Sequence, residues 1–337
     1  MLKLYRISFF SPATPIRAYT LFGSICWSYR LIGLDVGELC KRFEDNPPFL
    51  ISSPFPIVAI EKGNGIKRIP LLPKPILPIS NNFRREDDLC LKVNRKPIKK
   101  AQYITPQALK KLVESKELEE KSFNKSYFEI PEKGKAKFIA LREEGIRKVL
   151  SRTRSDISVR NMLNRETMRS EQLFTESIYY YPEMYFLIKY FDEKMIEKIE
   201  TCLELIEDNG LGANKNIGWG KVKIKEETTD LFKEFVAFIE SRLVVSANKL
   251  FMTLSPMLPT EGSMDLSRSY YKVEPYKAPV DTTFGGSFIW KRKVLYLTEG
   301  STIKPTGDKF VGCLKDVGTH NVKAYQYGFE FPISLEG

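Results

Sequence analysis

A short stretch between residues 210 and 220 holds the residue types best suited to chemistry in this chain. Glycine occupies four of its positions, accompanied by two asparagines, a lysine and a tryptophan. Glycines let another backbone approach closely, amide and ammonium groups bind phosphate oxygens, and an indole ring stacks on a base. We therefore predict an RNA-contacting loop made of Gly210, Gly212, Asn214, Lys215, Asn216, Gly218, Trp219 and the following Lys221.

Two other phosphate-binding loops do not fit this spacing. A P-loop requires a glycine five residues before its Gly-Lys pair and a Ser or Thr after it, but this chain has Lys215 and Val222 there. A dinucleotide-binding fingerprint starting at Gly210 would need a third glycine at 215. Both of those loops run from a strand into a helix, whereas this one runs from a predicted helix into a predicted strand. The remaining alternative is a turn that ends the helix and serves only the fold.

Positive charge is concentrated in one part of the chain. The 337 residues carry a net charge of +11, which predicts an anionic partner such as nucleic acid or an anionic membrane surface. Residues 133–170 contain 11 Lys+Arg and 4 Asp+Glu, a net of +7. Their arginines are irregularly spaced and lack compensating acids four residues away. Such a segment neutralises phosphates well; the alternative is a solvated, flexible insertion.

Composition excludes several other kinds of site. The single histidine, His320, excludes multi-histidine zinc sites, and no CxxC motif offers a zinc knuckle or a redox pair. No apolar run approaches the roughly 18 residues needed to span a bilayer. We predict a cytoplasmic protein without metal, cofactor or membrane partner, and with free thiols at Cys26, Cys40, Cys90, Cys202 and Cys313.

Hydrophobic periodicity outlines the elements that position the loop. Leu2 to Phe10 alternates as a strand, and a helix is predicted from Thr20, as its N-cap, to Ile32. The proline-rich stretch from 49 to 79 favours strands and turns. We also predict a strand over 177–191, a helix from Asp192 to Asn209, and a strand over 221–225. This order matches a β-α-β-β-α-β ferredoxin-like unit.

These elements predict an α+β protein with two ferredoxin-like, RRM-like domains. The first would span residues 1–230, carrying a large basic insertion at about 80–170 and the glycine-rich loop at 210–220. A linking helix is predicted over 231–242. A smaller second domain would span 243–337, and its strand order cannot be read from the pattern.

Three further passages give the chain a family resemblance. They are Thr20-Leu-Phe-Gly-Ser-Ile-Cys-Trp27, the segment from Asn161 to Thr167 with Leu173-Phe174 after it, and Tyr327-Gly-Phe-Glu-Phe-Pro332. With the loop, they resemble the RAMP superfamily, and within it the branch that caps the five-prime handle of the guide RNA in type III-A CRISPR Csm complexes. Two positions depart from that branch: Asn164 stands where Asp is common, and Ala18-Tyr19 where a small polar or acidic residue is usual.

The resemblance implies roles for particular residues. The first-helix start and the loop would cradle the five-prime handle of the crRNA, whereas the basic insertion would form a thumb-like hairpin bending the RNA at the handle–guide boundary. The first-helix residues are Arg17, Tyr19, Thr20 and Phe22, and the hairpin residues are Arg152, Arg154, Arg160, Asn164, Arg165 and Thr167. The implied protein partners are a large polymerase-like subunit and a RAMP backbone subunit, and the implied role is non-catalytic.

Two alternatives remain open from the sequence. Some RAMP relatives cut precursor RNA with a histidine, so His320 could support an endoribonuclease. The chain could also be a backbone RAMP subunit that repeats along the guide. No carboxylate pair in a setting suited to metal catalysis favours any other enzyme.

Overall fold

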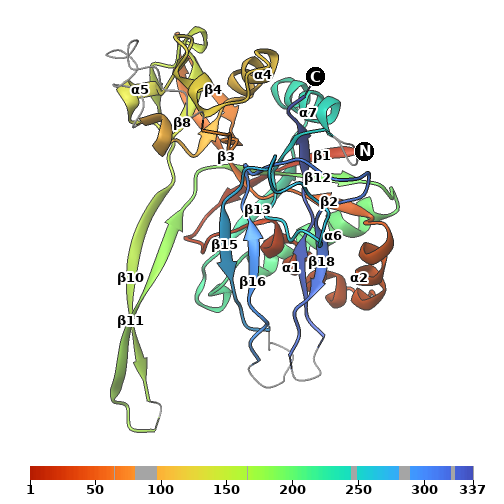
Figure 1. Ribbon diagram of the computed structural model, residues 1–337. Helices are drawn as coiled ribbons and strands as arrows, with labels where there is room; N and C mark the ends of the chain where they lie inside the picture. Colours follow the sequence, from red (N-terminus) through yellow and green to blue (C-terminus); the bar gives the residue numbers. More distant parts are fainter. Residues whose placement is uncertain are drawn as a thin grey trace.

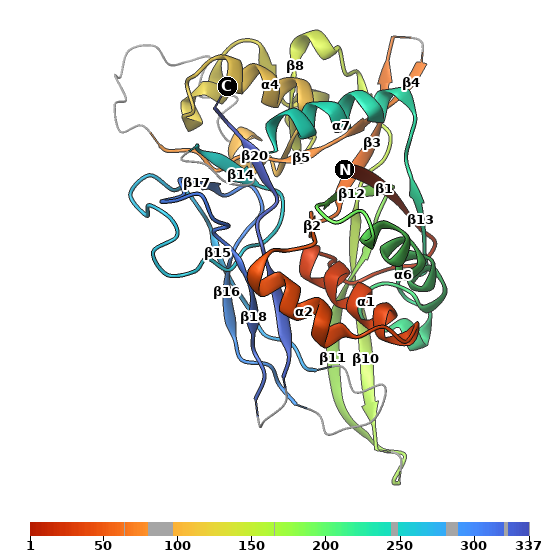
Figure 2. The same ribbon diagram turned by 90° about the vertical axis from the view of Figure 1, so that its right-hand side faces the viewer.

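The computed structural model describes residues 1–63, 65–79, 97–164, 166–243, 249–280, 289–319 and 323–336 (Figure 1). Helices and strands are mixed, as the predicted α+β class requires. A central antiparallel sheet carries a lobe of inserted residues above it, and a long two-stranded hairpin projects away from the body (Figure 1). The C-terminal strands extend to the same side as this hairpin (Figures 1 and 2).

The central sheet has the strand order predicted by the ferredoxin-like pattern. Along it, β13 pairs with β1, β1 with β12, and β12 with both β2 and β3, all antiparallel. The last strand therefore lies beside the first, as in a β-α-β-β-α-β unit. The strands are β1 (Leu2–Phe9), β2 (Phe49–Ile51), β3 (Phe55–Lys62), β12 (Met184–Tyr190) and β13 (Val222–Glu226).

Two helices complete this unit, and one begins earlier than predicted. Helix α1 covers Ala18–Leu31, so Arg17 is its N-cap and Thr20 occupies its third position. The Thr20 hydroxyl accepts a hydrogen bond from the Arg17 N–H at 3.4 Å, which closes the first turn from inside the helix. Helix α6 covers Met195–Asn209, so it begins three residues after the predicted Asp192, with Lys194 as its N-cap. It buries most of the apolar positions that repeat every three or four residues, as predicted.

The residues inserted between β3 and β12 form two different structures. The first is a lobe with the four-stranded sheet β5–β6–β8–β7, which we call the inserted lobe. Strands β4 (Gly65–Pro70) and β9 (Lys148–Val149) connect to it from the central sheet. The lobe comprises β5 (Leu72–Pro73), β6 (Tyr103–Ile104), α4 (Pro106–Glu114), η1 (Glu120–Asn124), β7 (Phe128–Glu129), α5 (Pro131–Gly134), β8 (Phe138–Leu141) and η2 (Arg142–Glu144).

The second inserted structure is the projecting hairpin. Strands β10 (Arg154–Leu163) and β11 (Ser170–Tyr180) pair along their whole length and project away from the sheet (Figure 1). Reciprocal backbone hydrogen bonds of 2.9 and 3.1 Å between Ala13 and Tyr179 fasten its base to the segment between β1 and α1. The strand predicted over 177–191 is thus two strands, because Pro182 lacks an N–H for a continuous ladder.

The C-terminal region is built from short strands. In the parts of it that the structure describes, no helix follows α7 (Asp230–Arg242). The described strands of this region therefore have no helices of their own packed against them. Instead, β19 packs on α1 and β18 packs on α2 (Val36–Asp45). Its strands are β14 (Phe251–Thr253), β15 (Val273–Tyr276), β16 (Val294–Leu297), β17 (Thr302–Ile303), β18 (Cys313–Asp316), β19 (Tyr325–Gly328) and β20 (Pro332–Ser334).

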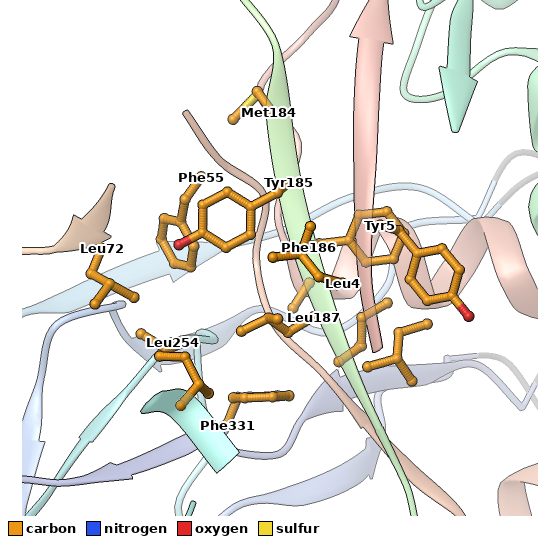
Figure 3. Packing of buried hydrophobic residues seen from close by; sticks show 14 of the residues in the cluster. Leu4, Tyr5, Phe55, Leu72, Met184, Tyr185, Phe186, Leu187, Leu254 and Phe331 are labelled. Carbon is orange, nitrogen blue, oxygen red and sulfur yellow. The ribbon is translucent and has the colours of Figure 1, made fainter. Parts of the chain in front are cut away.

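A single hydrophobic cluster joins these regions. It includes Leu4 and Phe186 of the central sheet, Leu72 of the inserted lobe, and Leu254 and Phe331 of the C-terminal region (Figure 3). Each of these side chains is at most 1% exposed. Burying one such side chain contributes roughly 1.5–3 kcal/mol to stability. The three regions therefore support one another through a shared core.

Candidate RNA-binding interface

The glycine-rich loop, residues 210–221, joins α6 to β13 as predicted. All four of its glycines adopt φ between 71° and 93°. A Cβ on Gly220 would lie 2.0 Å from a carbonyl oxygen of the same loop, and one on Gly212 would lie 2.8 Å from Thr14 Oγ1. These two glycines are required by packing within the protein. A Cβ on Gly218 would meet nothing within 4 Å, so only its left-handed backbone favours glycine.

Most backbone amides of the loop are engaged inside the protein. Eight of its N–H groups donate to protein oxygens, namely those of Gly210, Leu211, Ala213, Ile217, Gly218, Trp219, Gly220 and Lys221. The expectation that loop amides hold phosphate does not fit these positions, because each donor already has an acceptor. The half-buried Lys215 and the exposed Asn216 and Lys221 present polar side chains on the loop.

The hairpin tip is shaped by Asn164. Its Oδ1 accepts hydrogen bonds from the N–H groups of Glu166 and Thr167 at 2.9 and 3.0 Å, and its Nδ2 donates to Glu171 Oε1 at 2.7 Å. An aspartate would supply the same Oδ1 acceptor, so this departure from the family pattern preserves the turn. Thr167 is exposed at the tip, and Arg165 lies outside the described residues.

Two of the predicted hairpin arginines are paired with acids. Arg152, just before β10, forms an ion pair with Glu132 of α5, and Arg160 Nε lies 3.4 Å from Glu176 Oε2 on β11. The expectation of uncompensated charge is therefore wrong at these two positions. Their partners come from other elements rather than from one helical turn away. Arg154 is exposed at the root of the hairpin, opposite Tyr180.

The hairpin and the loop meet through four side chains, which we call the hairpin–loop junction. The Arg160 guanidinium lies 4.6 Å from the centre of the Trp219 ring, a cation–π contact. Asn214 Nδ2 donates to Glu176 Oε1 at 2.6 Å. The structure thus brings together the loop and the hairpin that the sequence had singled out separately. It also adds Glu176, which no sequence motif marked.

The start of α1 lies in a second polar cluster. Arg17 forms ion pairs with Glu274 at 2.8 Å and with Glu299 at 3.7 Å. Burial disfavours the charge on Arg17, but the two carboxylates outweigh it and hold the pKa of this guanidinium above its ordinary value. Arg17 is therefore already neutralised by acids of the C-terminal region.

The aromatic residues of α1 are packing residues. The Tyr19 ring lies 4.4 Å from that of Tyr276 and 5.1 Å from that of Tyr296, and we call the set of Arg17, Tyr19, Glu274, Tyr276 and Tyr296 the helix–strand junction. Burial raises the pKa of Tyr19 above its usual range. Phe22 is 3% exposed and packs in the core, so the prediction of RNA contact does not fit its side chain.

A cavity of about 1200 Å³ opens beside the helix–strand junction. Arg17 and Glu274 line it together with Lys74 and Tyr103 of the inserted lobe and Tyr181 after the hairpin. These residues come from segments far apart in the sequence. No local pattern could have indicated that they meet.

The remaining candidate features are metal-ligand clusters, membrane-spanning helices, the single histidine and the cysteines. Among the described residues, no group of three or more His, Cys, Asp or Glu side chains gathers as metal ligands, and no helix is long and apolar enough to cross a bilayer. His320, on which the endoribonuclease alternative depends, lies outside the described residues, as does Cys90. The described cysteines are free thiols: Cys26, Cys40, Cys202 and Cys313.

The family of the chain follows from a match to its sequence. A family model described as the RAMP superfamily matches residues 13–223, which is more than half of the chain. The matched range begins just before α1 and ends inside β13, so it includes the hairpin and the glycine-rich loop. The chain belongs to the RAMP superfamily.

The chain is also similar to individual proteins of known kind. The chain is 32% identical over 149 residues to the CRISPR system Cms protein Csm4 of Methanocaldococcus jannaschii, a match that covers 41% of this chain and only 36% of that protein. It also resembles a chain in the crystal structure of the Csm3-Csm4 subcomplex of the type III-A CRISPR-Cas interference complex. That likeness has a TM-score of 0.61 and 22% identity, and covers 98% of this chain and 99% of the other.

A second solved structure shows the same fold. A chain of the Csm1-Csm4 cassette in complex with cA4 matches with a TM-score of 0.52 and 18% identity, covering 99% of this chain and 98% of that one. At such identities both likenesses establish a shared fold over nearly the whole length.

Proposed function

We propose that this chain is a Csm4-like, non-catalytic RAMP subunit of a type III CRISPR complex that binds the five-prime handle of the crRNA. The observation that carries this proposal is the hairpin–loop junction, where side-chain contacts join the projecting hairpin to the glycine-rich loop. Arg160 and Trp219 supply a cation and an aromatic ring there, and Lys215 and Lys221 extend the positive charge along the loop. Such a surface suits a sugar-phosphate chain.

The proposed protein partners are a large polymerase-like subunit and a RAMP backbone subunit. The similar solved chains come from a Csm3-Csm4 subcomplex and a Csm1-Csm4 cassette, which supports two different neighbours for this chain as well. In this arrangement the RNA-binding surface would fix the handle. The two neighbouring subunits would extend along the guide and cover its end.

Handle binding is tested by titrating purified protein with a handle-containing RNA and with a scrambled RNA of equal length. We expect tighter binding of the handle RNA and no cleavage of either RNA. Lys215→Ala combined with Arg154→Ala should weaken binding and reduce the salt dependence by about one counterion per lost phosphate contact.

The matched control is Lys233→Ala, which removes an exposed lysine of α7. Equal affinity for the two RNAs would leave only non-specific electrostatic attraction and contradict the proposal. Cleavage of a repeat-containing precursor that disappears in His320→Ala would instead establish the endoribonuclease.

A further inference from the structure

The hairpin–loop junction contains one carboxylate, and this group contacts both halves of the junction. Glu176 Oε1 accepts a hydrogen bond from Asn214 Nδ2 of the loop at 2.6 Å, and its Oε2 lies 3.4 Å from Arg160 Nε on the neighbouring strand. We propose, given the RNA-binding function above, that Glu176 is a positioning residue. It holds the hairpin and the loop in one fixed arrangement for RNA.

The loop needs such an anchor at Asn214. This residue adopts φ 62° and ψ 26°, a left-handed conformation that costs free energy for residues other than glycine, although less for asparagine than for most. Its carbonyl oxygen accepts hydrogen bonds from the N–H groups of Ile217 and Trp219 at 3.1 and 3.3 Å. The orientation of Asn214 therefore sets the course of the residues that follow it. A hydrogen bond to a charged carboxylate is stronger than a neutral one and stabilises this turn.

The hairpin needs the same anchor for a different reason. A two-stranded ribbon is only marginally stable by itself, and its base is fastened at Tyr179 by the backbone hydrogen bonds to Ala13. One fastening acts as a hinge. Glu176 lies on β11 three residues from Tyr179 toward the hairpin tip, about 10 Å away at the usual rise per residue. It supplies a second attachment point, which fixes the direction of the hairpin.

The negative charge of Glu176 allows a positioning role to be distinguished from simple electrostatic attraction between the protein and RNA. Removing a negative charge from an RNA-binding surface should tighten RNA binding if only Coulomb attraction matters. Removing Glu176 should weaken binding if the carboxylate acts by positioning. The two explanations thus predict changes of opposite sign.

The experiment compares Glu176→Ala, Glu176→Gln and the control Asp156→Ala for affinity toward handle RNA. Asp156 is an exposed acid of β10 on the same face of the hairpin, and its Oδ1 accepts only the adjacent N–H of Ile157 among the described contacts. We expect Glu176→Ala to lose about tenfold in affinity. Because glutamine keeps the length but offers one acceptor oxygen in place of two, Glu176→Gln should keep only one of the two contacts and bind with an affinity between those of the wild type and Glu176→Ala. Asp156→Ala should bind equally well or more tightly.

Hydrogen exchange of the RNA-free protein provides the second readout. Glu176→Ala should speed exchange in β10 and β11 while the unfolding of the whole protein stays unchanged, and Asp156→Ala should not. If Glu176→Ala binds as tightly as Asp156→Ala, or leaves exchange in the hairpin unchanged, the positioning role is wrong. If hairpin exchange rises but the wild type shows no preference for handle RNA, the handle-binding function fails and the contact is only structural.

Discussion

The hairpin–loop junction and the helix–strand junction use similar residues for different purposes. Each places an arginine beside a glutamate and near aromatic residues, and the side chains of Arg160 and Arg17 are 24% and 26% exposed. Arg160 has one glutamate and one indole ring, whereas Arg17 has two glutamates and lies next to a cluster of three tyrosines. Residue type and exposure alone therefore do not distinguish a binding surface from an internal contact.

The surroundings make the distinction. The helix–strand junction continues into the shared core through Phe22, so its residues contribute to stability first. The hairpin–loop junction joins the projecting hairpin to the glycine-rich loop, and exposed polar residues of that loop, such as Asn216, lie close to it in the chain. We infer that RNA recognition depends mainly on the hairpin–loop junction, and that the helix–strand junction keeps the C-terminal strands on α1.

The largest expected effect is a loss of stability from a substitution next to the helix–strand junction. Phe22→Ala removes a ring that packs against Phe43 and Tyr327, with ring centroids 5.2 and 4.9 Å away. It should lower the free energy of unfolding by about 3–5 kcal/mol, measured by urea denaturation. Ile157→Ala is the control, since this hairpin residue is 65% exposed, and it should change stability by less than about 0.5 kcal/mol. Equal losses would mean that the hairpin is as much part of the core as α1 is.

Substituting glycines of the loop should lower stability by a smaller amount, and the loss should differ between Gly220 and Gly218. Gly220→Ala places a Cβ 2.0 Å from a backbone oxygen, so the loop must open and stability should fall by more than about 2 kcal/mol. Gly218→Ala meets no atom within 4 Å and should cost about 1 kcal/mol, because only the left-handed backbone resists it. Thermal unfolding of the two variants checks this order. A Gly218→Ala variant as unstable as Gly220→Ala would contradict the packing role assigned to Gly220.

The sequence predicted the parts of the fold that are governed by local patterns. Alternating and three-to-four-residue repeats identified β1, α6 and β13, and their order led to the correct sheet. Glycine content likewise marked the loop. The charge was a poorer guide to the hairpin, because residues 133–153, before β10, carry a net of +5 and residues 154–170 a net of only +2. The limits appear where contacts are distant: Asn214 and Glu176 are 38 residues apart, and Arg17 and Glu274 are 257 residues apart. No spacing rule predicts such pairs, because strand pairing and domain packing create them.

Contacts between residues distant in the sequence also explain where the sequence predictions differ from the structure. The pattern of the first helix did not show that Phe22 would be buried. Its ring is covered by residues distant in the sequence, namely Phe43 of α2, Phe49 of β2 and Tyr327 of β19. Arg152 and Arg160 looked uncompensated because their glutamates belong to other elements. The C-terminal strands are two to four residues long, too short for a period to be visible.

Cross-linking tests the central claim most directly. Handle RNA carrying a photoreactive uridine at each position in turn would be irradiated in complex with the protein, and the attached peptides identified by mass spectrometry. We predict that handle positions attach to peptides of residues 210–221 and of β10 or β11. Attachment confined to the C-terminal strands or the inserted lobe, with none at the loop or the hairpin, would contradict the assignment of the hairpin–loop junction as the RNA-binding surface.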